Sequence, residues 1–244
     1  MSDFDRNYAA SRGVGFGRAV AVDAGLRAYM LRVYNYMAIG VALTGVAAWV
    51  VFQLAVTNPA FAQTLFGTPL YWVLLLAPLG LVFFLSFRIE HLQAGTARAL
   101  FFFYAALLGV SLAPIFMAYT GTSIARVFFI SAASFGALSL YGYTTQRDLS
   151  PFGSFLMMGL FGIILASLVN LFFQSSMVSF VISAVGVLVF AGLTAWDTQR
   201  IKEMYDPMDD GTVGGRKAVM GALALYLDFI NLFLMLLRLF GDRR

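Results

Sequence analysis

The stretch Gly221-Ala-Leu-Ala-Leu-Tyr-Leu-Asp-Phe-Ile-Asn-Leu-Phe-Leu-Met-Leu-Leu-Arg238 decides the fold of this chain. It lies in an apolar run over residues 218–240, about the 20 residues that a transmembrane helix needs. The run nevertheless carries one acid, Asp228. If the helix begins near Ala218, about ten residues at about 1.5 Å each place this carboxyl group about 15 Å deep. Because polar groups in hydrocarbon must face protein rather than lipid, we expect this helix to be the most enclosed one.

The rest of the chain is equally apolar. Of its 244 residues 61% are hydrophobic and 11% are charged, whereas a soluble domain is about 45–50% apolar and about 25% charged. Six further apolar runs are long enough to span a bilayer. They cover residues 33–56, 69–87, 99–119, 124–143, 152–173 and 177–201. The sequence therefore predicts an all-α, polytopic membrane protein with seven transmembrane helices, built as an N-terminal segment (1–30) and a single membrane domain (31–244).

The composition also excludes several classes of function. The net charge is +4, but the 16 basic residues are dispersed, so we expect no nucleic-acid partner. The chain has no cysteine and one histidine, which excludes disulfides, thiolate metal sites, cysteine nucleophiles and multi-histidine metal centres. We find no glycine-rich phosphate loop, no nucleophile elbow and no histidine base within a span. We therefore expect no enzyme activity and no cofactor.

Basic residues predict the orientation in the membrane. The first apolar run is too long for the core of a signal peptide, about 7–15 residues. With seven spans, twelve basic residues fall on the side of the N-terminus and four on the other, which predicts a cytoplasmic N-terminus. Three arginines at the C-terminus oppose this rule: Arg238, Arg243 and Arg244. Either the C-terminus lies outside, or the last helix is re-entrant and returns it to the inside.

A second acid lies within a span. Asp197 occurs in Leu193-Thr-Ala-Trp-Asp-Thr-Gln-Arg-Ile201, in the last turns of the sixth run. The sixth and seventh helices are antiparallel, so both aspartates can lie in the cytoplasmic half of the membrane and meet. Two carboxyl groups in contact in a dry site cannot both ionise easily, and such a pair titrates as a unit. The alternative is that Asp197 ends its helix in solvent and pairs with Arg200 or Lys202.

One basic residue is a candidate counter-charge for these acids. Arg88 ends the second run in Phe83-Phe-Leu-Ser-Phe-Arg-Ile-Glu-His91. Its stem can snorkel, which makes it an ordinary interface arginine, or it can reach inward toward Asp197 and Asp228.

Several motifs resemble those of the Bax inhibitor-1 family, also called the TMBIM or YccA-type family. They are Leu138-Ser-Leu-Tyr-Gly-Tyr-Thr-Thr-Gln-Arg-Asp-Leu-Ser150, Leu108-Gly-Val-Ser-Leu-Ala-Pro114, Asp197-Thr-Gln-Arg-Ile201 and Leu225-Tyr-Leu-Asp-Phe-Ile-Asn-Leu-Phe233. The resemblance covers about residues 25–241.

The resemblance implies a seven-helix bundle whose last helix is central. It also implies a calcium leak gated by pH through an aspartate pair, for which Asp197 and Asp228 are the matching positions and the possible transient calcium site. An arginine at the end of the second helix, here Arg88, belongs to the same gate. The short, arginine-rich N-terminal segment and the lack of cysteine suit a bacterial inner-membrane member of this family, and some bacterial family members bind a membrane-bound AAA protease.

Three functions therefore compete. The first is a pH-gated calcium leak in the lipid bilayer. The second is a non-transporting partner or modulator of a membrane-bound AAA protease, with the N-terminal segment and residues 203–217 as the contact. The third is an intramembrane aspartyl protease, but its Gly-x-Gly-Asp motif would need glycine where this chain has Leu225 and Leu227.

Overall fold

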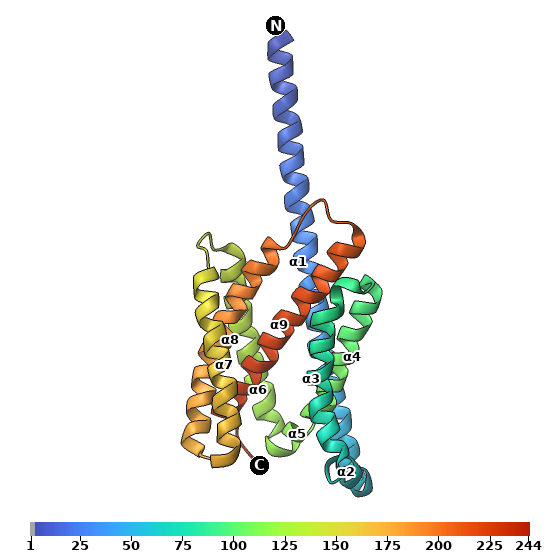
Figure 1. Cartoon of the computed structure of the whole chain (residues 1–244), viewed down its shortest axis with the longest axis vertical. Coiled ribbons are helices and arrows are strands. Elements are labelled where there is room, and N and C mark those ends of the chain that lie inside the picture. Colours follow the sequence, from blue (N-terminus) through green and yellow to red (C-terminus); the bar gives the residue numbers. More distant parts are fainter. Residues whose placement is uncertain (1–2) are drawn as a thin grey trace.

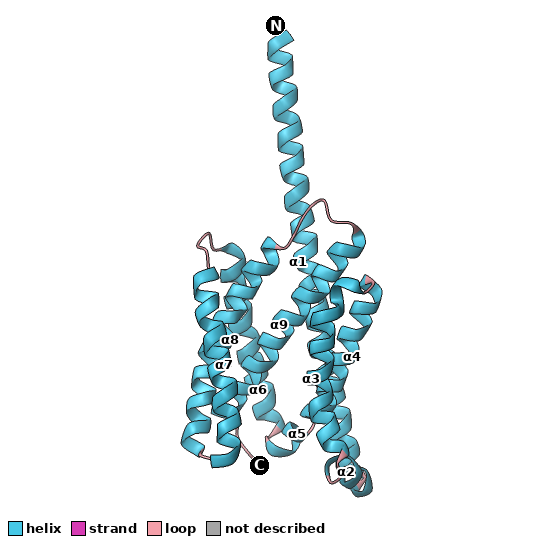
Figure 2. Ribbon diagram, in the orientation of Figure 1, coloured by secondary structure: helices cyan, strands magenta, loops and turns pink. Residues whose placement is uncertain are grey.

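A computed structural model describes the backbone of residues 3–244 and the side chains of residues 23–244. The described chain is a series of helices joined by short loops (Figure 2). They are α1 (Asp3–Thr57), α2 (Pro59–Phe66), α3 (Leu70–Arg88), η1 (Ile89–His91), α4 (Ala94–Leu112), α5 (Pro114–Ala118), α6 (Gly121–Thr144), α7 (Ser150–Phe173), α8 (Ser176–Glu203) and α9 (Gly211–Phe240). Seven helical segments among the described residues are long and apolar enough to cross a membrane, which confirms the predicted architecture.

The C-terminal helix occupies the centre. Figure 1 shows α9 running obliquely between α1, α3 and α4 on one side and α6, α7 and α8 on the other, and it packs against α1, α4, α6 and α8. In its most apolar 18-residue stretch 67% of the residues are buried, against 11% in α3 and in α7. The prediction that the last helix is the most enclosed is therefore confirmed.

The two chain ends lie at opposite ends of the bundle (Figure 1). Because α9 is one uninterrupted helix of 30 residues, the structure favours a C-terminus on the side of the membrane away from the N-terminus. The last residues pair with the connection between α5 and α6, where the Arg244 N–H donates to the Ala118 carbonyl and the Thr120 N–H donates to the Asp242 carbonyl.

The helices extend beyond the apolar runs because local capping continues them. Asp210 caps α9: its side chain accepts hydrogen bonds from the backbone N–H groups of Thr212 and Val213, at 2.8 and 2.6 Å, which satisfies donors that a helix start leaves free. The seventh helix therefore begins at Gly211 rather than near residue 218. In α1, the helix continues without a break across the expected boundary between residues 30 and 31.

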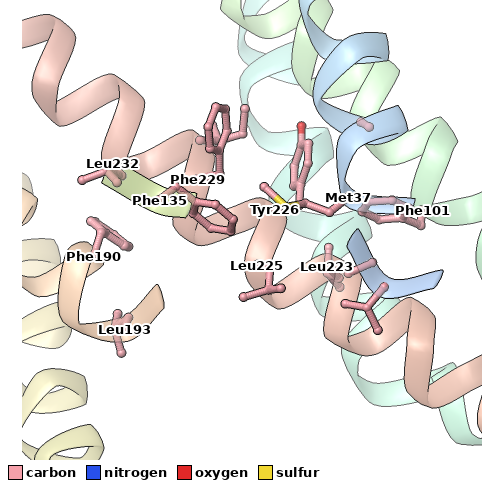
Figure 3. Packing of buried hydrophobic residues seen from close by; sticks show 14 of the residues in the cluster. Met37, Phe101, Phe135, Phe190, Leu193, Leu223, Leu225, Tyr226, Phe229 and Leu232 are labelled. Carbon is pink, nitrogen blue, oxygen red and sulfur yellow. The ribbon is translucent and has the colours of Figure 1, made fainter. Parts of the chain in front are cut away.

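Buried side chains of α9 reach into both groups of helices (Figure 3). On one side Tyr226 meets Phe101 of α4 edge-on, with ring centroids 5.6 Å apart. Further along α9, Phe229 meets Phe135 of α6 in the same manner at 5.6 Å. These T-shaped contacts are the favoured geometry for aromatic pairs, so α9 joins the two groups through one continuous core.

Candidate functional site: a buried carboxyl pair

The structure brings the two predicted aspartates together. Asp228 lies near the middle of α9 with 5% of its surface exposed, and Asp197 lies in α8, half-buried, less than two turns before the helix ends. Their carboxyl groups are within hydrogen-bonding reach of each other. Since a carboxylate only accepts hydrogen bonds, one of the two must carry a proton for this bond to form. The Oδ2 atom of Asp228 is buried and has no hydrogen-bond partner.

The pair lines a cavity of about 800 Å³. Its walls come from α3, α7, α8 and α9 and are mostly apolar, and three neutral polar residues join the aspartates there: Ser86, Ser167 and Asn231. A smaller cavity of about 210 Å³, between α3, α8 and α9, shares Ser86 and Asp197 with the first and extends toward Met204 at the end of α8. Asp197 therefore lies where the two cavities meet, and Asp228 lines only the larger one.

The cation nearest to the pair is Arg200, not Arg88. Arg200 follows Asp197 by three residues in α8, faces its charge and lines both cavities. Its guanidinium also lies 5.6 Å from the centroid of the Trp196 ring. Arg88, at the end of α3, is exposed and belongs to neither cavity lining. The proposed gate role of Arg88 stays a prediction that this arrangement does not support directly.

Lys202, the other candidate partner of Asp197, is engaged elsewhere. Its ammonium group donates to the Tyr143 carbonyl at 2.9 Å and lies 5.2 Å from the centroid of the Tyr143 ring. Of the two basic residues that follow Asp197, only Arg200 therefore faces the carboxyl pair.

The two carboxyl groups are too few to hold calcium tightly. Calcium takes 6–8 oxygen ligands in proteins. Among the residues whose side chains are described, no group of three or more acidic or histidine side chains could hold a metal ion. The hydroxyl and amide oxygens of Ser86, Ser167 and Asn231 are additional weak ligands for an ion in transit.

Residues outside the cavities fix the turn of α8 that carries Asp197. A Cβ atom at Gly142 of α6 would clash with the backbone of Ala195, and one at Gly153 of α7 would clash with the Trp196 ring. Both glycines thus allow close approach to the two residues that precede Asp197.

The α6–α7 connection binds the next turn of the same face of α8. The Gln199 side chain accepts a hydrogen bond from the Leu149 N–H and donates one to the Arg147 carbonyl, both at 2.8 Å. The connection and the glycines together hold the side of α8 that faces α6 and α7, next to Asp197.

Comparisons with known proteins agree with this architecture. A family model described as "Inhibitor of apoptosis-promoting Bax1" matches residues 26–244, nearly the whole chain. The chain belongs to the Bax inhibitor-1 family. This Bax inhibitor-1 protein is 49% identical over 224 residues to the inner membrane protein YbhL of Escherichia coli, a match that covers 91% of this chain and 94% of the relative. It is 54% identical to the protein RP147 of Rickettsia prowazekii, over 91% of this chain and 92% of the relative.

The family assignment gives the predicted motifs their structural context. In this Bax inhibitor-1 protein, an integral membrane protein, the motif at residues 138–150 forms the end of α6 and the connection that holds α8. The motif at 108–114 contains the break between α4 and α5. Sequence reasoning identified both aspartates, but it named Arg200 only in the alternative in which Asp197 lies in solvent, and it took Arg88 as the cation of the buried pair. The signal was available, because residues three apart on a helix are neighbours.

Proposed function

We propose that this chain is a pH-gated leak channel for cations, with calcium as the ion and the Asp197–Asp228 pair as the gate. One observation carries the proposal: two carboxyl groups meet in one cavity, and one of them, Asp197, also lines a second cavity that adjoins the first. A group that changes charge at this junction changes both the shape of the passage and its attraction for a cation.

The two cavities extend through much of the thickness of the membrane. Their linings run along α9 from Met220 to Met235, about 22 Å at about 1.5 Å per residue. The hydrocarbon core of a bilayer is about 30 Å thick. A leak also requires that the ion leave again, which suits a site with only two carboxyl groups.

The direction of gating follows from the charges. While the pair shares a proton, its hydrogen bond ties α8 to α9. Loss of that proton leaves two facing carboxylates, whose repulsion at about 4 Å is about 4 kcal/mol at an effective dielectric constant near 20. Since about 1.4 kcal/mol changes an equilibrium tenfold, higher pH should separate the helices and open the passage. We expect Arg200, which faces Asp197, to stabilise the open, charged state.

Membrane placement is part of the proposal. We place the protein in a bacterial inner membrane, because the relative YbhL is named an inner membrane protein. The excess of basic residues on the side of the N-terminus puts that end in the cytoplasm.

Calcium efflux from proteoliposomes containing only this protein tests the gate. We expect flux to rise several-fold between about pH 6 and 8 in the unmodified chain and to stay constant in Asp228→Asn. Asp148→Asn is a matched control. It removes an equal charge from an exposed loop, where the N–H of Ser150 donates to the carboxylate and holds the pKa of Asp148 below its usual range, so that this residue does not titrate in the window.

Each outcome of the flux experiment is informative. A full pH response in Asp228→Asn would exclude the pair as the sensor. Absence of any flux in the unmodified chain would refute the leak and make a non-transporting partner of a membrane-bound AAA protease the first alternative. Arg200→Gln should reduce flux at pH 8 more than Arg88→Gln does; the reverse order would restore Arg88 as the counter-charge.

A further inference from the structure

A second hollow lies between α1 and α6, whereas the carboxyl cavity lies between α3 and α7. It consists of three adjoining cavities of about 460, 530 and 280 Å³. The first and second share Phe135, and the second and third share Val41, Gly45 and Phe128. Together they form one groove along the two helices, which we call the α1–α6 groove.

Small residues on both walls give the α1–α6 groove its depth. They are Ala38, Ala42 and Gly45 on α1, and Gly121, Ala125, Ala132 and Gly136 on α6. Small residues in membrane helices usually allow close helix contact, as Gly142 does here. A Cβ atom at Gly45 or Gly136, in contrast, would meet nothing within 4 Å. These two glycines therefore leave space instead of closing it, and in a bilayer an apolar space without partner atoms is unfavourable.

The two ends of the groove differ in polarity. At the end near the N-terminal side lie Arg27 and Tyr143, together with a hydrogen bond between the hydroxyl groups of Tyr34 and Ser139. Arg27 is exposed and forms no ion pair with any residue whose side chain is described. The other end is lined almost entirely by apolar side chains.

The groove is longer than one leaflet. On α1 its lining runs from Arg27 to Ala48, about 31 Å at about 1.5 Å per residue, which is about the whole of the roughly 30 Å hydrocarbon core. A lipid with its charged head at Arg27 can therefore lie with its chain along the groove, from the polar end into the apolar part.

We propose that the α1–α6 groove binds an anionic phospholipid of the leaflet on the N-terminal side, with one acyl chain in the groove and the phosphate on Arg27. A guanidinium forms strong, paired hydrogen bonds with phosphate oxygens. A zwitterionic lipid carries its own cation, which competes for the phosphate, so the site favours a lipid with net negative charge. The proposal does not depend on ion conduction.

Native mass spectrometry of the full-length protein in mild detergent tests this site, with added phosphatidylglycerol or phosphatidylcholine. We expect one phosphatidylglycerol molecule to be retained by the unmodified chain and lost when Gly136→Leu or Gly45→Leu fills the groove. The matched control is Gly162→Leu on α7, another exposed glycine whose Cβ would meet nothing within 4 Å. It should keep the lipid.

The head-group contact has its own test, which does not depend on how the leucine variants fold. Arg27→Gln should lower the preference for phosphatidylglycerol over phosphatidylcholine about five-fold, the effect of one basic group at a membrane surface. An unchanged preference would overturn the assignment of Arg27. Equal lipid retention in the groove and control variants would overturn the site, and a dimer that Gly136→Leu dissociates would make a second copy of the chain the occupant.

Discussion

Tyr226 and Asp228 are two residues apart on α9 and both are buried. The polar atom of Tyr226 is hydrogen-bonded, whereas one oxygen of Asp228 is not. The hydroxyl of Tyr226 bonds the hydroxyl of Thr44 at 2.6 Å, and Thr44 donates to the Ala105 carbonyl at 2.9 Å. This chain of bonds joins α9, α1 and α4. Asp228, facing the other group of helices, keeps one oxygen without a partner.

The hydrogen bond between Tyr226 and Thr44 should persist at every pH, whereas the contact between Asp197 and Asp228 should change with pH. Hydrogen bonds between neutral, fully paired groups do not respond to pH near neutrality. A carboxyl pair with an unpaired oxygen is held less firmly, because a buried polar atom without a partner costs about 1–3 kcal/mol. We infer that the bonds of Tyr226 and Thr44 hold α9 to α1 and α4 at every pH, whereas the carboxyl pair is a part of the α8–α9 contact that pH can change.

The largest change in stability is expected for substitution of Tyr226, which anchors α9 to α1 and α4. Tyr226 is fully buried and contacts Phe101 and Tyr104 edge-on, so Tyr226→Ala should lower the free energy of unfolding by about 3–5 kcal/mol. Thermal unfolding in detergent micelles measures this loss. Leu188→Ala is a suitable control, since that side chain is 72% exposed and should lose much less. Similar losses in both variants would mean that Tyr226 is no anchor.

A smaller change in stability, of opposite sign, is expected for a substitution in the carboxyl pair. The amide in Asp228→Asn can donate to Asp197 and removes the facing charge, so this variant should be more stable than the unmodified chain by about 1–3 kcal/mol. The gain should be larger at pH 8 than at pH 5, because ionisation of both acids destabilises only the unmodified pair. Unfolding curves at the two pH values decide; a variant that is less stable at both would show that the pair stabilises the fold.

The smallest change in stability is expected when only the hydrogen bond between Tyr226 and Thr44 is removed. Tyr226→Phe keeps the ring and removes the bond to Thr44, which should cost about 0.6 kcal/mol, the average for such bonds between membrane helices. A double-mutant cycle with Thr44→Val measures the coupling. If the two losses simply add, the bond contributes nothing and the anchor is due to packing alone.

The sequence predicted the fold well because membrane spans depend on a local property. Twenty apolar residues in a row predict a span without knowledge of any contact, and all seven runs correspond to helices. The sequence analysis missed the short helix α2 and the break before Pro114. The number of apolar residues in a run does not show where the chain bends, either between spans or within one. The enclosure of α9 was predictable because Asp228 must be kept away from lipid.

The candidate site was predictable only in part. The meeting of Asp197 and Asp228 follows from antiparallel neighbours at similar depth. The choice between Arg88 and Arg200 does not follow from depth, because both lie near the same end of the bundle. It depends on which face of its helix each arginine occupies, and Arg200 shares the face of Asp197.

The central position of α9 also has a consequence for biosynthesis, because this helix leaves the ribosome after the six other spans of the bundle. The six earlier spans can enter the membrane one by one, since lipid covers their apolar faces as well as protein does. They cannot settle into their final contacts until Tyr226 and its neighbours arrive. A chain without α9 would therefore insert but lack the contacts that α9 makes with both groups of helices, so the assembly of the bundle can be checked only after α9 has been synthesised.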